Sequence, residues 1–253
     1  MRAAGDGDGG TETLRSGEAP RLARPSPPGL IRTVLTLLAK ELLVELRTLE
    51  SVPAMSLFSL STLVVFHFAL NAASLSGDLA SGVLWVTLLF AAMLGVNRLF
   101  VADADEGGFD AFLLAPVDRS AMLLAKACAL FIYLLALELI AIPAFVLLLL
   151  GPHSGAGWGQ LIATVILADT GLAVIGTFVA ALAVRTRSRD LIGPLIALPM
   201  LVPIAIGASR ASAPFLSAGA HEGGGARWLL LLGLYDLLFG LIAYAVFDFL
   251  LED

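Results

Sequence analysis

The sequence contains little charge and a single cysteine. Of its 253 residues, 14% are charged and 58% are apolar, whereas soluble globular domains carry about 25% charged and about 45–50% apolar residues. This composition excludes an ordinary water-soluble enzyme and predicts a membrane protein. The lone Cys128 excludes an internal disulfide bond and a cysteine-based metal cluster. Acidic residues outnumber basic ones, 21 to 15, which argues against a nucleic-acid-binding protein, because such proteins need a basic face.

Familiar catalytic motifs are also missing from the sequence. It has no G-x-x-x-x-G-K-[ST] phosphate-binding loop, so ATP hydrolysis by that route is excluded. It has no H-E-x-x-H and no G-x-S-x-G motif, which leaves a metalloprotease or a serine hydrolase without support. The three histidines, His67, His153 and His221, are far apart in the sequence. We therefore expect a chain that is not an enzyme and that has no metal site and no resident cofactor.

The composition divides the chain into three parts. Residues 1–28 are rich in glycine, proline and alternating charge, which predicts a disordered cytoplasmic tail. Residues 29–52 combine apolar residues at helical spacing with several charges, which predicts an amphipathic helix lying along the membrane interface. Residues 53–253 contain the long apolar segments and form the predicted membrane domain.

Two acidic residues interrupt the apolar face of the predicted interfacial helix. Glu41 and Glu45 lie one helical turn apart. They either meet a partner protein or pair with the nearby basic residues Lys40 and Arg47, and the spacing favours the pairing.

Six apolar segments follow, each near the roughly 20 residues that a helix needs to cross a bilayer. They are residues 53–73, 80–99, 122–150, 159–184, 191–207 and 228–250. The predicted fold is thus an all-α integral membrane protein with six transmembrane helices. The third segment contains Pro143, which predicts a kink or a tilt. The fifth is short and carries Pro194, Pro199 and Pro203. Because each proline removes a backbone donor, we expect this helix to be broken or bent.

The basic residues predict the orientation of the chain. Only Arg210 and Arg227 of the 15 basic residues fall on the side opposite the N-terminus. Positively charged segments stay in the cytoplasm, so the N-terminus is predicted to be cytoplasmic. Six spans return the C-terminus to the same side.

The loop between the second and third segments carries the most informative pattern. Residues 97–126 read NRLFVADADEGGFDAFLLAPVDRSAMLLAK, and they resemble the CcmB family of heme-exporter permeases, which are ABC-2-type membrane subunits. Other stretches look like the same family in the same order: KELLVELR, Glu138 followed by Pro143, GTFVAALAVRTRSRD, the three prolines of the fifth segment and YDLLF. The resemblance covers about residue 30 to the C-terminus. Asp169 departs from it, since an uncharged residue is expected there.

The resemblance implies a permease subunit of an ABC transporter in c-type cytochrome biogenesis, located in the bacterial inner membrane. Such a subunit would pair with a separate ATPase chain, CcmA, and associate with CcmC, the small CcmD and the heme chaperone CcmE. ATP would act only through the ATPase, heme would be the possible substrate, and two copies of the chain would form one transporter. Two alternatives stay open: a non-transporting assembly module whose ATP-driven motion releases the heme-loaded chaperone, and an ABC-2 permease for another substrate.

The same loop predicts the contact with the ATPase. Phe109, Phe112 and Leu113 share one face of a short helix at i, i+3 and i+4, and a groove on a partner would accept such a face. The predicted coupling residues are Asp105, Gly107, Phe109, Asp110, Phe112, Leu113 and Pro116. The alternative is an amphipathic turn on the lipid headgroups, which the acidic excess of the loop disfavours.

Four ionisable residues lie inside the predicted spans. They are His67, Glu138, Asp169 and Asp236, and all fall in the half of the membrane away from the termini. Charged groups in hydrocarbon are costly unless they are paired or hydrated. We predict either an outward-opening polar cavity that contains Glu138 and Asp236 with His67 nearby, or a polar network that only fixes the helix packing.

Overall fold

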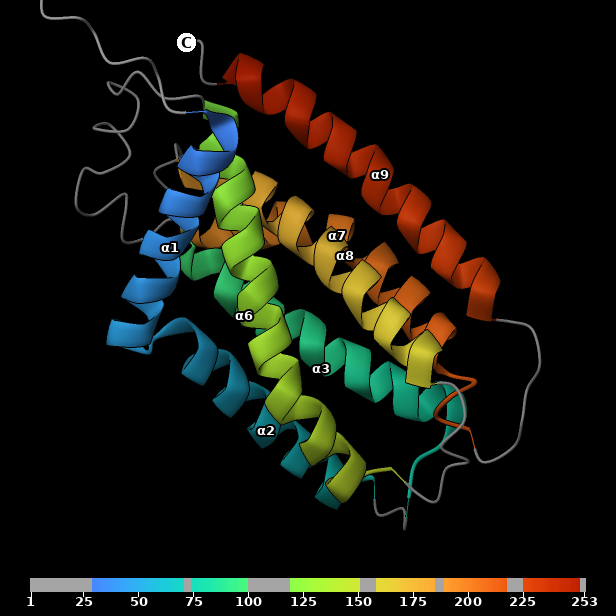
Figure 1. The fold of residues 1–253 in the computed structure, drawn as a ribbon. Coiled ribbons are helices and arrows are strands. Elements are labelled where there is room, and N and C mark those ends of the chain that lie inside the picture. Colours follow the sequence, from blue (N-terminus) through green and yellow to red (C-terminus); the bar gives the residue numbers. More distant parts are fainter. Residues whose placement is uncertain are drawn as a thin grey trace, which may run out of the picture.

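A computed structural model describes most of the chain (Figure 1). The described residues are 29–70, 74–99, 119–150, 158–184, 189–217 and 225–250. They form the helices α1 (Leu30–Thr48), α2 (Ser51–Ala69), α3 (Gly77–Arg98), α6 (Arg119–Leu148), α7 (Trp158–Val184), α8 (Arg189–Ser212) and α9 (Gly225–Leu250). Across these ranges the β-structure consists of one isolated bridge between Leu75 and Leu150. The predicted tail, residues 1–28, lies outside the described residues.

Six of these helices, α2, α3, α6, α7, α8 and α9, are long and apolar enough to span a membrane. The shortest, α2, has 19 residues, which at about 1.5 Å per residue cover about 28 Å, close to the hydrocarbon thickness of about 30 Å. The predicted all-α fold with six transmembrane helices is therefore confirmed, and the chain is a multi-pass membrane protein. A helix before the first span, predicted within residues 29–52, is also confirmed as α1, which ends at Thr48; residues 51 and 52 belong to α2.

The fifth span differs from its prediction. It is one uninterrupted helix, α8, of 24 residues. Of the two predicted forms, broken or bent, the broken one is therefore wrong, and the span is longer than the predicted residues 191–207. Pro199 and Pro203 lie on its exposed side, where the loss of an amide donor disturbs no packed neighbour. The opposite side is fully buried at Ala197, Leu201 and Ile204, and this packing holds the helix together across the prolines. The third span, α6, continues through Pro143 over 30 residues, and the kink or tilt predicted there stays a prediction.

The helices α3 and α7 form the centre of the bundle, and α2 and α9 lie at its opposite edges (Figure 1). In the most apolar stretch of α3 and of α7, 72% of the residues are buried, against 22% for α2 and 17% for α9. Two glycines allow close approach of helices, one between α7 and α3 and one between α3 and α2. A Cβ atom at Gly176 of α7 would lie 2.6 Å from Cγ2 of Val96 in α3, and one at Gly95 would lie 2.7 Å from Sδ of Met55 in α2.

Successive spanning helices run in opposite directions, which gives the bundle two ends. One end, which we call the α1 end, contains α1, the start of α2, the end of α3 and the start of α6. There α1 packs along α6, and Val34 of α1 forms a small buried cluster with Ala121 and Ala125. The other end, which we call the far end, contains the end of α2, the start of α3 and the ends of α6 and α8.

Candidate functional site

The predicted coupling residues lie in a segment that the structure does not describe. The segment comprises residues 100–118 and holds Asp105, Gly107, Phe109, Asp110, Phe112, Leu113 and Pro116. The described residues on both sides of it, Leu99 and the start of α6, belong to the α1 end of the bundle. The structure therefore describes the chain on either side of this predicted site but none of its residues, and the site stays a prediction.

Two of the predicted intramembrane carboxyl groups are brought together. Glu138 of α6 and Asp169 of α7 are 4% and 1% exposed, and their carboxyl groups lie within hydrogen-bonding reach of each other. Among the described residues, Oε2 of Glu138 and Oδ2 of Asp169 have no hydrogen-bond partner. Since an ionised carboxylate can only accept hydrogen bonds, a bond between these two groups needs a proton on one of them. The two carboxyl groups thus face each other between α6 and α7.

The third carboxyl group, Asp236 of α9, lies apart from this pair. It is 8% exposed, and it packs against Gly171 of α7, where any Cβ atom would collide with the carboxyl group of Asp236. Both of its oxygens lack a hydrogen-bond partner within the described residues. Because Gly171 has no side-chain carbon, the carboxyl group of Asp236 fits against the backbone of α7 at this position.

The predicted histidine is also separate from the carboxyl groups. His67 is exposed near the end of α2, where its Nδ1 lies 2.5 Å from the carbonyl oxygen of Leu148, the last residue of α6. Leu148 follows Glu138 by ten residues, or about 15 Å along α6. The structure therefore places His67 at the far end, where it joins α2 to α6. Within the described residues, no group of three His, Cys, Asp or Glu side chains is arranged to hold a metal ion.

A polar ladder between α3 and α8 was not predicted. At the far end, Arg210 donates to Asp78 at 2.9 Å, and the hydroxyl groups of Ser81 and Ser209 are 3.1 Å apart. Deeper in the bundle, Nε1 of the buried Trp85 donates to the hydroxyl oxygen of Ser212 at 2.9 Å. The positions 78, 81 and 85 share one face of α3. This i, i+3, i+7 spacing of two polar residues and a tryptophan could have indicated the ladder from the sequence.

A groove runs beside this ladder between α3 and α8. Its volume is about 670 Å³, within the roughly 300–1,000 Å³ of small-molecule sites. Its walls are mainly apolar, and the ion pair of the ladder lies at one end. Residues that line it include Trp85, Val86 and Phe90 of α3 and Leu198, Val202 and Arg210 of α8.

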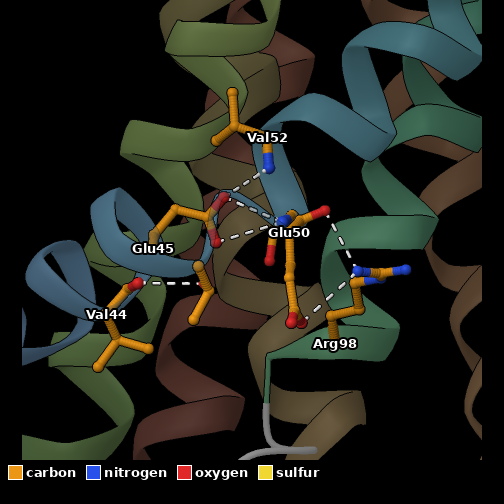
Figure 2. Close-up of polar contacts among 7 residues, drawn as sticks. Val44, Glu45, Glu50, Val52 and Arg98 are labelled. Atoms are coloured by element: carbon orange, nitrogen blue, oxygen red, sulfur yellow. Dashed lines mark hydrogen bonds and ion pairs between the residues drawn. The ribbon is translucent and has the colours of Figure 1, made fainter.

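The acidic residues of α1 serve different purposes. Glu41 pairs with Lys40, as predicted, at 3.3 Å. The prediction for Glu45 is wrong, because its carboxylate instead accepts backbone N–H groups of Ser51 at 2.9 Å and Val52 at 2.8 Å (Figure 2). These are the first two residues of α2, whose amide groups have no acceptor within the helix. Glu45 thus joins α1 to α2, a role that i, i+4 pairing rules do not anticipate.

A second contact joins the start of α2 to the end of α3. Arg98 donates to the backbone oxygen of Glu50 at 3.2 Å, and its guanidinium group lies 3.8 Å from the carboxylate of Glu50 (Figure 2). The α1 end is therefore held by side-chain contacts among α1, α2 and α3.

Comparison with known proteins identifies similar chains. The family described as "CcmB protein" matches residues 32–249. A protein named heme exporter protein B from Rhodobacter capsulatus is 36% identical over 128 residues, which are 51% of this chain and 58% of that protein. The protein of the same name from Paracoccus denitrificans is 32% identical over 145 residues, 57% of this chain and 65% of its own length. The one from Bradyrhizobium diazoefficiens is 28% identical over 190 residues, 75% of this chain and 85% of its own length. The chain thus spans less than two thirds of the first two relatives.

Proposed function

The chain belongs to the CcmB protein family, and from this premise we propose that it is the permease subunit of a heme-related ABC transporter in c-type cytochrome biogenesis. The observation that carries the proposal is the family match over residues 32–249, which includes all six membrane-length helices. The transport subunit would reside in the bacterial inner membrane with both termini in the cytoplasm. ATP hydrolysis would belong to a separate ATPase chain, CcmA, because this sequence has no phosphate-binding loop.

We propose that the contact with the ATPase lies in the predicted coupling segment from Asp105 to Leu114, which Pro116 ends. Phe109 and Phe112 would anchor this segment in a groove of the ATPase, with Asp105 and Asp110 at the rim of the contact. Two copies of the permease would bind two ATPase chains. Phe109→Ala combined with Phe112→Ala is then expected to abolish co-purification of the ATPase, and retained binding would contradict this assignment.

Heme is the proposed substrate because the relatives are named heme exporter protein B. The groove between α3 and α8 suits an amphipathic planar molecule, since its walls are apolar and Arg210 lies at one end. An acidic group on the ligand would pair with Arg210. It would take the place of Asp78, with which Arg210 is paired in this structure. Filling the groove by Val86→Trp is expected to lower heme-dependent output. Leu231→Trp on α9 is the matched control, because Leu231 and Val86 are 44% and 45% exposed.

The alternative function is an assembly module that moves no heme. In that case ATP-driven motion would release heme-loaded CcmE from CcmC and CcmD. The distinguishing experiment reconstitutes the permease in vesicles with the ATPase alone, then with CcmC, CcmD and the chaperone, and follows heme on both sides of the bilayer. ATP-dependent heme movement with the ATPase alone supports export. Release of the chaperone without heme movement supports the assembly role, and the absence of both contradicts the proposed function.

A further inference from the structure

The groove between α3 and α8 is open sideways along its length. Its lining extends from Asp78 to Phe90 on α3 and from Leu198 to Arg210 on α8, about twelve residues or about 18 Å on each helix. Val86 and Phe90 are 45% and 46% exposed, and they lie on a helix that is long and apolar enough to span the membrane. A molecule dissolved in the bilayer therefore reaches the groove from the lipid, without passing through the closely packed centre of the bundle.

The buried part of the polar ladder holds the two walls of the groove together. Nε1 of the buried Trp85 donates to the hydroxyl oxygen of Ser212 at 2.9 Å. The hydroxyl groups of Ser81 and Ser209 are 3.1 Å apart. These contacts use neither of the two charged side chains at the end of the groove. The spacing of α3 and α8 is therefore kept when that ion pair breaks.

The ion pair itself is exposed and easily exchanged. The guanidinium group of Arg210 lies 2.9 Å from Oδ2 of Asp78, and the side chains of Asp78 and Arg210 are 72% and 53% exposed. Ion pairs between exposed side chains shift an equilibrium by up to about fivefold. Because the Asp78 carboxylate is hydrated when it leaves Arg210, a second carboxylate can replace it at little cost. A guanidinium group binds any carboxylate in the same way, through charge-assisted hydrogen bonds.

The two charges cancel each other in the empty groove. Among the described residues that line it, Arg210 carries the positive charge and Asp78 the negative charge. A ligand with an acidic group gains the guanidinium group only by displacing Asp78, since the Asp78 carboxylate otherwise repels the acid. A neutral ligand of the same shape gains nothing from this exchange, because it has no charge to offer Arg210.

We propose that Asp78 is a specificity-determining residue of this groove. Its carboxylate occupies Arg210 when the groove is empty, and a lipid-soluble ligand that bears a carboxylate of its own takes its place. A neutral ligand leaves the ion pair intact. Asp78 is thus a competitor, built into the chain, for the one guanidinium group that a carboxylic acid needs. This inference rests on the proposed function, since it takes the groove as the substrate site.

The experiment measures binding to the complete chain in nanodiscs of a zwitterionic phospholipid. Trp158→Phe and Trp228→Phe leave Trp85, which lines the groove, as the remaining tryptophan. The probes are protoporphyrin IX, which bears carboxylates, and its dimethyl ester, which has the same ring and no acidic group. Saturable quenching of the Trp85 fluorescence gives the dissociation constant of each probe.

Three variants and one control test the exchange. Asp78→Asn is expected to tighten binding of the acid by about two- to fivefold, because the competing ion pair is gone. Arg210→Gln is expected to weaken it by about fivefold or more, and the double variant is expected to match Arg210→Gln alone. The ester is expected to bind all variants equally, which also shows that the groove is intact in each. Glu50→Gln is the control, because its carboxylate is 68% exposed and paired with Arg98 at the opposite end of the bundle.

Several results would overturn the proposal. One is an unchanged affinity for the acid in Asp78→Asn, and another is a gain that persists in the double variant, because Asp78 would then act by general repulsion rather than by occupying Arg210. The titrations are repeated in nanodiscs that contain an anionic phospholipid. If the chain with both charged residues then binds the acid no better than Arg210→Gln does, a lipid phosphate occupies Arg210 and the proposal is overturned. Failure of both porphyrins to bind saturably overturns the groove as the substrate site of the proposed function, whereas the other results concern Asp78 and Arg210 alone.

Discussion

Replacement of Glu45 by alanine should destabilise the protein more than a change at most other polar residues of α1. Its carboxylate is 8% exposed and accepts two backbone N–H bonds, from Ser51 at 2.9 Å and Val52 at 2.8 Å. Because the third residue of α2 is Pro53, which has no N–H group, Glu45 satisfies both of the amide donors that the first three positions of α2 contain. Hydrogen bonds to a charged group contribute about 1.5–3 kcal/mol each.

The two amide groups are half-buried, so water replaces part of what is lost. We therefore expect Glu45→Ala to lower the free energy of unfolding by about 2–4 kcal/mol. Glu45→Gln keeps an acceptor oxygen and loses the favourable charge at a helix start, at a cost of about 1 kcal/mol. Unfolding of the purified protein in mixed micelles of a mild detergent and dodecyl sulfate, followed by circular dichroism, measures both values.

Glu50→Ala provides the control. Glu50 lies at the same joint, but its carboxylate is exposed and 3.8 Å from Arg98, and such surface pairs contribute about 0.2–1 kcal/mol. The bond from Arg98 to the backbone oxygen of Glu50 survives this substitution. Equal losses in Glu45→Ala and Glu50→Ala, or a loss below about 0.5 kcal/mol in Glu45→Ala, would refute the assigned role of the two N–H bonds.

Three further predictions concern stability and use the same unfolding measurement. Leu49 has a left-handed backbone conformation with φ of 52°, which costs a non-glycine residue about 1–2 kcal/mol. Leu49→Gly should therefore be neutral or stabilising, and a clear decrease in the free energy of unfolding would contradict this. Gly171→Ala should cost about 1–3 kcal/mol by colliding with Asp236 and Ile204, whereas Gly240→Ala, with open space around it, should cost nothing. Trp85→Phe should cost about 1 kcal/mol through the lost bond to Ser212, and an unchanged midpoint would show that this bond contributes nothing.

The number and the positions of the helices were predictable, because the bilayer sets the length of an apolar segment. Helix α7 was expected at residues 159–184 and observed at Trp158–Val184. The prediction that the prolines break α8 was wrong. Helix propensity accounts for the N–H group that each proline lacks, but it does not account for the packing of the buried opposite face. For Ala197 and Leu201 that packing is complete, and it depends on neighbours that lie far away in the sequence.

The partners of the polar residues were less predictable than their positions. Glu138, Asp169 and Asp236 are buried, as intramembrane charges should be. Their grouping depends on the rotation of each helix about its axis, which hydropathy does not encode when a helix is apolar on all sides. Helix α7, for example, directs Asp169 toward Glu138 of α6 and Gly171 toward Asp236 of α9, although the two residues are two positions apart.

The distribution of polar contacts along the bundle bears on how it can move. At the α1 end, Glu45, Arg98 and Lys126 connect four helices through charged groups. At the far end, Arg210 connects α3 with α8 and His67 connects α2 with α6. The same end has contacts between these pairs and to α7: the backbone amide of Leu75, just before α3, donates to Leu149, just after α6, at 2.7 Å, and Gln160 of α7 donates to Ala211 of α8 at 2.7 Å. Between the two ends, close packing at Gly95 and Gly176 leaves no space for sliding. Polar contacts therefore join neighbouring helices at both ends of the bundle, so a helix that moves at either end must break these contacts or move its neighbours with it.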